Sequence, residues 1–375
     1  MRRAVALLVA ALCPVGASAG DVLRETWSAY VGRFVQPDGR VVDPKAGGIT
    51  TSEGQAYAML RAVWMDDRAV FDRALGWAVE HLNRDVRKDR LWAWKWDGRV
   101  VDEAFATDAD QDAALALLMA AGVWNDDAYA ERARGMLADI WEKGTTVAGR
   151  RRFLLGGDRL CQGHTCRVNP SYYAPYAYRL FARADRSRPW LRLVDTTYVL
   201  LERNAALTAT GLPSDWLLLD VTKGALLPGG DRDSRYAFDA IRTHWRIRLD
   251  GVLFGEERAR AYLARSLAWL VERFRQDRRL SASILSDGRA GADYEALEML
   301  AAVMPALEES APDVADAMNA RVEAALSDGL WGDRESYYLQ NWAWFGTALR
   351  LRALAPFERL RAGASGSAPG RGAAP

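Results

Sequence analysis

The chain has 375 residues, of which 50% are hydrophobic and 26% are charged. This composition is typical of a folded globular protein and excludes a disordered or fibrous one. The formal net charge is only +1, which argues against a nucleic-acid-binding protein, because such proteins usually carry an excess of basic residues on one face.

The N-terminal segment has the pattern of a secretory signal peptide. Arg2 and Arg3 precede an apolar run over residues 4–12, and small residues follow at 17–19. This predicts a signal peptide over residues 1–19, cleaved after Ala19, and a secreted or periplasmic mature protein. The apolar run is too short to span a bilayer, and no later segment reaches about eighteen uninterrupted apolar residues, so we expect no stable membrane insertion.

Helical periodicity dominates the rest of the chain. Apolar residues recur at spacings of three and four, and strand-like alternation is scarce. The predicted helices cover residues 22–34, 54–65, 68–82, 112–122, 127–143, 171–182, 190–202, 234–246, 258–274, 293–306, 314–327 and 340–354. A solenoid would show a repeat period, and none is found. The pattern therefore predicts an all-α fold, a toroid of six helix pairs written (α/α)6.

Two long connections, residues 88–105 and 144–169, interrupt this pattern and are expected to form a cleft on one face. No linker rich in Pro, Gly or Ser divides the chain before its end. We therefore predict one domain over residues 20–360 and a disordered tail, rich in Gly, Ala, Ser and Pro, over residues 361–375.

The cysteines indicate an oxidising compartment. Removal of the signal peptide takes away Cys13 and leaves Cys161 and Cys166 in a polar loop. A disulfide between these two is the favoured interpretation. The alternative is half a metal site with His164 between them, but further Cys or His ligands are missing nearby. We expect no metal ion and no cofactor.

Glu53 stands in the first of three segments that carry candidate chemistry. A Ser or Thr at a helix start, followed by Glu and Gln, is consistent with simple capping. Gly54 is a poor helix former for a first turn, but it allows a ligand to approach closely. The pattern alone leaves both interpretations open.

The second segment carries Asp108, Asp110 and Asp112 at alternate positions. Like charges so close together repel one another, so stability does not explain them well. Asp108 could cap the following helix, and a calcium loop would need a Gly and a distal Glu that are missing. A functional site is favoured, although Asp110 could equally hold the loop together.

The third segment places Asp239 three residues before Arg242, which is often just an ion pair on one helix face. Aromatic residues are dense around it and elsewhere, for the chain has 15 tryptophans. A core rarely needs so many, since each buried indole N–H requires a partner. Flat rings do suit the stacking of sugars, so at least one of Trp92, Trp94 and Trp96 is expected to face a ligand.

At these residues the sequence resembles glycoside hydrolase family 8. That family of inverting endoglucanases also includes chitosanases, xylanases and periplasmic cellulases of bacterial cellulose-synthesis systems. The resemblance implies the same toroid that the helix count predicts. The matching segments, in the family's order, are residues 52–55 (SEGQ), 106–110 (ATDAD), 169–172 (NPSY), 239–242 (DAIR), 245–246 (WR) and 337–338 (YY).

The resemblance also implies roles for individual residues. Glu53 matches the general acid, Asp239 the general base, and Asp108 the residue that holds the distorted sugar. Arg242 is expected to keep Asp239 ionised. One departure is Phe238, where the family often has Tyr, so a hydroxyl that could orient the attacking water is absent. His244 is a second departure, at a position where Pro is common.

The expected activity is endo-cleavage of a β-1,4-glucan, without binding of nucleic acid. A role beside a cellulose synthase system is a further hypothesis. Chitosan or xylan as substrate, a non-catalytic polysaccharide-binding protein and a lyase are the alternatives. The residues expected to contact the glucan are Trp94, Trp96, Asp110, Tyr172, Arg242 and Tyr338.

Overall fold

The computed structural model describes residues 19–84, 87–158 and 160–363. The predicted signal peptide, apart from its last residue, lies outside these ranges, as do residues 364–375 of the predicted tail. Residues 361–363 of that tail form the end of a helix. Among the described residues, no helix is both long and apolar enough to cross a bilayer.

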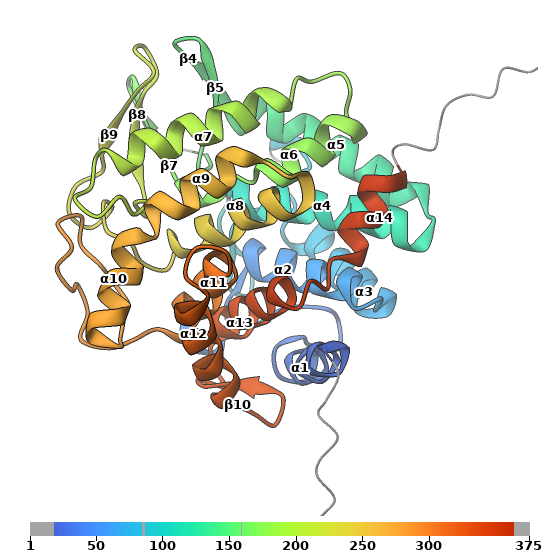
Figure 1. Cartoon of the computed structure of the whole chain (residues 1–375). Coiled ribbons are helices and arrows are strands. Elements are labelled where there is room, and N and C mark those ends of the chain that lie inside the picture. The colour runs from blue at the N-terminus through green and yellow to red at the C-terminus, as the bar shows by residue number, and fades with distance from the viewer. Residues whose placement is uncertain (1–18, 85–86, 159, 364–375) are drawn as a thin grey trace, which may run out of the picture.

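The described residues form fourteen α-helices (Figure 1). They are α1 (Ala19–Phe34), α2 (Ser52–Trp64), α3 (Arg68–His81), α4 (Thr107–Trp124), α5 (Asp127–Lys143), α6 (Pro175–Ala184), α7 (Leu191–Ala205), α8 (Ile241–Phe254), α9 (Glu257–Ser266), α10 (Ala268–Asp277), α11 (Leu297–Leu307), α12 (Pro312–Ala324), α13 (Tyr337–Arg350) and α14 (Ala355–Gly363).

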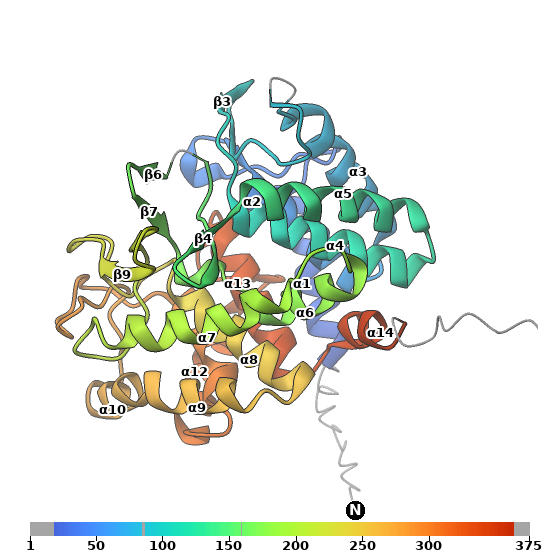
Figure 2. The same ribbon diagram turned by 90° about the horizontal axis from the view of Figure 1, so that it is seen from above.

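Six of these helices close into an inner ring. Each contacts the next in the order α2, α4, α6, α8, α11, α13 and back to α2. A second helix packs outside each of them: α3 on α2, α5 on α4, α7 on α6, α9 on α8, α12 on α11 and α1 on α13 (Figures 1 and 2). The predicted toroid of six helix pairs is confirmed.

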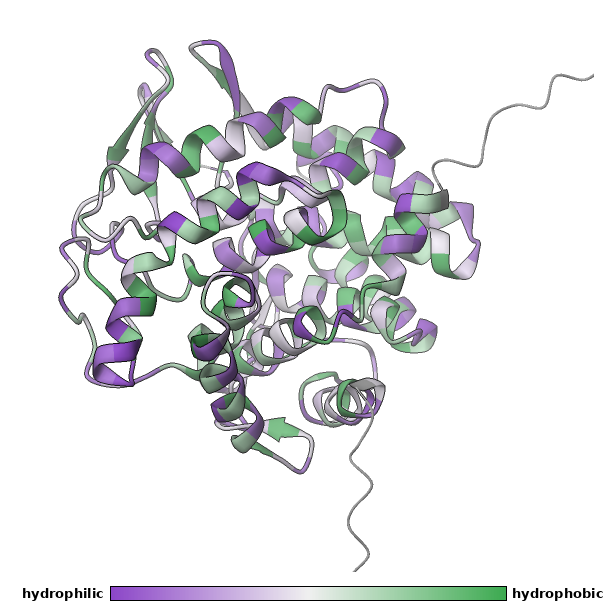
Figure 3. Ribbon diagram, viewed as in Figure 1, coloured by the Kyte–Doolittle hydropathy of each residue, from purple (hydrophilic) through white to green (hydrophobic). Residues whose placement is uncertain are grey.

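The inner position of a helix follows from its sequence. Helix α11 is almost entirely apolar and buried, because neighbours cover it on all sides. Helices outside the ring carry more polar residues, which Figure 3 shows as purple turns such as the end of α10, a helix that packs on α9 and α12. Gly346 on α13 allows two inner helices to touch, because a Cβ there would lie 2.0 Å from the backbone oxygen of Ala301 on α11.

Several predicted helix boundaries were wrong, among them the starts at 171 and 293, which lie four residues before α6 and α11. Three differences bear on the fold or the site. The segment 258–274 forms two helices, α9 and α10, since α9 packs on α8 whereas α10 turns to pack on α12. Helix α4 begins at Thr107 instead of residue 112, which places Asp108 inside its first turn. Helix α8 begins at Ile241 instead of residue 234, so Asp239 lies in the turn before it.

The two long connections contain short antiparallel strands. The first contributes β2 (Lys95–Trp96) and β3 (Val100–Asp102), and β2 pairs with β1 (Thr50–Thr51). The second contains the hairpin β4 (Thr145–Ala148) and β5 (Arg151–Leu154), then β6 (Cys161–Gln162) and β7 (Thr165–Val168). The remaining strands are β8 (Leu217–Asp220), β9 (Ala225–Pro228), β10 (Leu326–Ser327) and β11 (Leu330–Trp331).

Strands β6 to β9 form one four-stranded sheet in chain order. Together with the hairpin β4–β5, this sheet projects from one side of the molecule (Figure 1). Pairing of Val168 with Leu217 joins β7 to β8, which fixes the start of β8 and therefore the neighbouring Trp216. The sheet thus positions a side chain that reaches the candidate site.

Candidate active site

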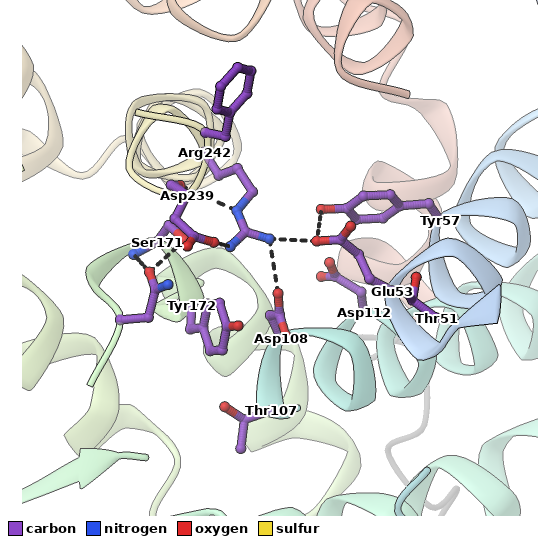
Figure 4. A network of polar contacts seen from close by, with 12 residues as sticks. Thr51, Glu53, Tyr57, Thr107, Asp108, Asp112, Ser171, Tyr172, Asp239 and Arg242 are labelled. Carbon is purple, nitrogen blue, oxygen red and sulfur yellow. Dashed lines mark hydrogen bonds and ion pairs between the residues drawn. The ribbon is translucent and has the colours of Figure 1, made fainter. Parts of the chain in front are cut away.

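The site forms where the N-terminal ends of three inner helices meet. Glu53 lies in the first turn of α2 and Asp108 in the first turn of α4. Asp239 lies two residues before α8, and Arg242 lies in the first turn of that helix. Residues that are far apart in the sequence are thereby brought to one end of the ring (Figure 4).

Arg242 connects all three carboxylates. Its Nη1 donates to Glu53 Oε2 at 2.7 Å and to Asp108 Oδ2 at 2.9 Å. Its Nη2 donates to Asp239 Oδ1, and its Nε donates to the backbone oxygen of Asp239 at 3.2 Å. Only 2% of this side chain is exposed, so Arg242 holds the three carboxylates from the buried side of the site. The prediction that it contacts the substrate stays a prediction.

Glu53 is held by two tyrosines as well as by Arg242. The hydroxyl of Tyr337 donates to Oε1 at 2.9 Å, and that of Tyr57 donates to Oε2 at 3.3 Å. Burial raises the pKa of Glu53 to about 7, and the nearby Asp108 carboxylate adds to this, against the lowering effects of Arg242 and Tyr337. Since 20% of the side chain remains exposed, Glu53 can donate a proton to a bound molecule.

Asp239 is the most accessible of the three carboxylates, with 34% of its side chain exposed. Its Oδ1 binds Arg242, and its Oδ2 accepts a hydrogen bond from the indole Nε1 of Trp216 at 3.0 Å. This arrangement orients an open carboxylate toward solvent, where it can accept a proton from water. The sequence analysis missed Trp216, because its approach to Asp239 depends on the sheet that holds β8.

Asp108 is buried, and burial is the main cause of its raised pKa. Its Oδ2 binds Arg242, whereas its Oδ1 has no hydrogen-bond partner among the described residues. A buried acceptor without a partner is costly. The role of Asp108 in holding a sugar stays a prediction. The idea that Asp108 caps a helix through its side chain is not supported, because the N-cap of α4 is Ala106.

Asp110 and Asp112 have structural roles. Asp110 has 0% of its surface exposed, and its Oδ1 accepts the backbone N–H of Trp92 at 3.0 Å. The alternative, that Asp110 holds the loop together, agrees with this hydrogen bond. The predicted contact of Asp110 with substrate stays a prediction. Asp112 forms a buried two-point ion pair with Arg246, at 2.9 and 2.7 Å.

The predicted aromatic residues differ in their accessibility. Trp94 is half-buried, and its backbone oxygen accepts the N–H of Ser52, which places it beside the start of α2. Trp96 is half-buried under the guanidinium of Arg40, at 4.3 Å from the ring centre. Both roles in substrate binding stay predictions.

The two predicted tyrosines pack close to the carboxylates. Tyr172 is largely buried, with the Arg242 guanidinium 5.2 Å from its ring centre and Trp216 at 5.5 Å. Tyr338 is half-buried, and its hydroxyl donates to the backbone oxygen of Phe238. The hydroxyl of Tyr338 therefore steadies the turn that carries Asp239. Substrate contacts of these two residues also stay predictions.

Outside the site, Cys161 and Cys166 form a disulfide across the paired strands β6 and β7. His244, which the sequence analysis singled out, is buried between Tyr236 and Ser266. Burial lowers the pKa of His244 to about 3, so it stays neutral. Within the described ranges, no group of three or more His, Cys, Asp or Glu side chains could hold a metal ion.

Comparisons with known proteins find endoglucanases among the relatives of this chain. The endoglucanase of Cellulomonas uda is 34% identical over 221 residues, 58% of this chain and 60% of that protein. The endoglucanase of Xanthomonas axonopodis pv. citri is 32% identical over 273 residues, 69% of each chain. The chain thus matches about 60% of the length of several curated relatives, including an endoglucanase of Escherichia coli at 34% identity over 227 residues.

Solved structures extend the likeness over most of the chain. The endo-1,4-D-glucanase of Vibrio fischeri superposes with a TM-score of 0.72 at 25% identity, over 86% of this chain and 93% of that one. A family 8 endoglucanase from Klebsiella pneumoniae gives 0.71 at 25% identity, over 87% and 99% of the two chains. The family model for glycosyl hydrolases family 8 matches residues 1–324, and the chain belongs to this family.

Proposed function

We propose that the protein is an endo-acting β-1,4-glucanase that hydrolyses its substrate with inversion, with Glu53 as general acid and Asp239 as general base. The observation that carries the proposal is that two carboxylates bound to the same guanidinium differ in their environment. Glu53 has a pKa raised to about 7, whereas Asp239 is open to solvent and accepts hydrogen bonds on both oxygens. Two carboxyl groups with unlike environments are what acid and base roles require.

In the proposed reaction, Glu53 gives its proton to the glycosidic oxygen as the bond from that oxygen to the anomeric carbon breaks. Asp239 takes a proton from a water molecule, whose oxygen bonds to the same carbon from the opposite face. Inverting enzymes separate the two carboxyl groups by about 6.5–9.5 Å to leave room for this water. Glu53 and Asp239 contact different nitrogens of Arg242, which keeps them apart on two sides of that group (Figure 4).

Asp108 is proposed to bind the sugar at the point of cleavage. Its Oδ2 is fixed by Arg242, and its Oδ1 is left without a partner in the part of the chain that the structure describes. A sugar hydroxyl that donates to this oxygen would remove the cost of leaving it unsatisfied. The distorted sugar ring would thereby be held between the acid and the base.

The pH dependence of catalysis should follow Glu53. Because burial raises the pKa of Glu53 to about 7, the protonated acid is present below that pH and is lost above it, so kcat/KM should fall as the pH rises through about 7. Tyr337 donates to the ionised carboxylate and lowers this pKa. Tyr337→Phe should therefore move the basic limb to higher pH in a pH–rate profile. A limb that stays in place, or moves to lower pH, would contradict the assignment.

The substrate is proposed from the relatives, which are named endoglucanases at 31–34% identity. A xylobiose complex from Teredinibacter turnerae has a TM-score of 0.74 but is only 19% identical, so that likeness concerns the fold alone. Initial rates should be compared on carboxymethylcellulose, chitosan and xylan. We expect the highest rate on carboxymethylcellulose, with viscosity falling faster than reducing ends appear. A higher rate on chitosan or xylan would overturn the substrate assignment.

We further propose that the protein acts outside the cytoplasm, in the periplasm or secreted. The pattern over residues 1–19 and the cysteine pair support this proposal. A place beside a cellulose synthase stays a prediction. N-terminal sequencing of the mature protein should begin at Gly20, and an intact Met1 terminus in a cytoplasmic fraction would contradict the proposal.

A further inference from the structure

The turn that carries Asp239 is held by a buried carboxylate outside the three described above. The backbone N–H groups of Ala237 and Ala240 both donate to Asp215 Oδ1, at 3.1 and 2.9 Å. Asp239 lies between these two residues in the sequence. Asp215 Oδ2 accepts from Arg235 Nε at 3.2 Å. Asp215 itself is only 4% exposed, so its place is defined by the protein interior.

Asp215 is in turn anchored to the outer wall of the toroid. Its own N–H donates to the backbone oxygen of Arg235 at 2.7 Å. The preceding Ser214 exchanges two hydrogen bonds with Asn204, a fully buried residue near the end of α7, at 2.9 and 3.0 Å. Residues 214–215 are therefore held by contacts outside the turn that carries Asp239, and Asp215 binds that turn through its side chain.

The next residue, Trp216, holds Asp239 by a second route. Its indole Nε1 donates to Asp239 Oδ2 at 3.0 Å. One short segment thus fixes the backbone around Asp239 through Asp215 and the side chain of Asp239 through Trp216. This matters because Asp239 precedes α8, and its backbone is joined to that helix through its carbonyl oxygen, which accepts the N–H of Arg242 at 3.3 Å.

We propose that Asp215 is a positioning residue for Asp239. Asp215 sets the direction of the base by binding the backbone N–H groups of Ala237 and Ala240, which lie on either side of Asp239 in the sequence. This inference rests on the proposed function. Asp215 does not touch Glu53 or Arg242 in any described contact. It acts on Asp239 through the hydrogen bonds to the turn and through charge, since burial and the nearby Asp239 carboxylate raise the pKa of Asp215 to about 6. A misplacement of about 1 Å in a reacting group can cost on the order of 100-fold in rate. The effect of losing Asp215 should therefore fall on kcat and spare substrate binding.

The test compares Asp215→Ala, Asp215→Asn and the matched control Arg235→Ala on cellopentaose. Ala removes both carboxylate oxygens of Asp215, and we expect kcat to fall by about 30–100-fold. KM should stay unchanged, as should the stoichiometry of substrate binding measured by calorimetry, which reports the folded fraction. Asn keeps an oxygen at Oδ1 and should restore kcat to within about fivefold of wild type. Arg235 contacts only Oδ2 through its side chain, so its removal leaves both hydrogen bonds to Oδ1 in place and should lower kcat less than Asp215→Ala does.

A second substrate distinguishes a loss of the general base from a loss of the general acid. A β-cellooligosaccharyl fluoride has a leaving group that needs no proton, so Glu53→Gln should recover activity on it. Asp215→Ala should keep its full defect, because water still has to be activated by Asp239. Recovery of Asp215→Ala on the fluoride would overturn the proposal.

Further outcomes distinguish this inference from the proposed function. If the wild-type protein does not cleave glucan, or if Asp239→Asn keeps wild-type kcat, the proposed function fails. If Asp239→Asn is inactive while a fully folded Asp215→Ala has wild-type kcat, the positioning role alone is refuted. Should Asp215→Ala fail to fold, Asp215→Ser replaces it: its shorter side chain should give a lower kcat than Asn at equal KM, and equal kcat values refute the role.

Discussion

Glu53→Gln is expected to lower kcat on cellopentaose by about 10³-fold or more, because a positioned general acid contributes roughly 10²–10⁴-fold and Gln has no proton to give. KM should stay near the wild-type value, since Gln has the same shape and can still accept from Tyr337. Steady-state kinetics measures both quantities, and the fluoride substrate should restore most of the lost rate.

The matched control for this variant is Glu257→Gln, which changes an exposed glutamate in the first turn of α9. Its kcat should equal that of the wild type. If Glu53→Gln keeps more than about a tenth of wild-type kcat on cellopentaose, then Glu53 is not the general acid. Failure of the fluoride to rescue a folded Glu53→Gln would indicate that the carboxyl group has another role.

Arg242→Met should have the second large effect, on both stability and activity. It removes the one cation that Glu53, Asp108 and Asp239 share. Breaking a buried ion pair by removing one partner costs about 3–5 kcal/mol, and a site that loses its three contacts should lose kcat by a factor of about 10³. Arg242→Lys keeps the charge but cannot reach all three carboxylates with one nitrogen, so an intermediate loss is expected.

The destabilisation of Arg242→Met should depend on pH. Arg242 lowers the pKa of both Glu53 and Asp108, so without it these folded-state pKa values rise further above their unfolded values. A carboxyl group with a raised folded pKa binds more protons in the folded state, and stability is then lost as the pH rises. Urea unfolding should show a larger deficit relative to wild type at pH 8 than at pH 5. An equal deficit at both pH values would contradict this account.

The ring of helices could be predicted from the sequence because apolar spacing at three and four residues is a local property. The break between α9 and α10 at Leu267 could not be predicted. The direction of each helix depends on the helix on which it packs, and periodicity does not reveal which helices are neighbours. The short strands were missed for a similar reason. A pair such as β7 and β8 is defined by a partner far away in the chain, while each strand alone is too short to show alternation.

The individual residues of the site could be predicted from the sequence, but the hydrogen-bond network that joins them could not. Motifs pointed to Glu53, Asp108 and Asp239, and the structure brings these three together. That a single guanidinium joins them depends on closure of the ring, which no local pattern contains. The burial of Asp110 could not be predicted either, because it depends on the direction in which the first turn of α4 faces.

Two contributions to the site had no signal in the sequence analysis. Trp216 reaches Asp239 only because the sheet fixes the start of β8. Asp215 acts through backbone N–H groups, and any residue can supply such groups, so the sequence does not mark the contact. Phe238 was rightly noted as lacking a hydroxyl. The structure adds that the hydroxyl of Tyr338 binds the backbone of Phe238.

The central claim, that Glu53 and Asp239 act as acid and base on opposite faces of the sugar, is tested most directly by the anomer of the first product. Proton NMR should follow the hydrolysis of cellopentaose at early times, before mutarotation mixes the anomers. The account predicts that the new reducing end appears first as the α-anomer. An initial β-anomer would mean retention and would contradict the role of Asp239 as the base that activates water.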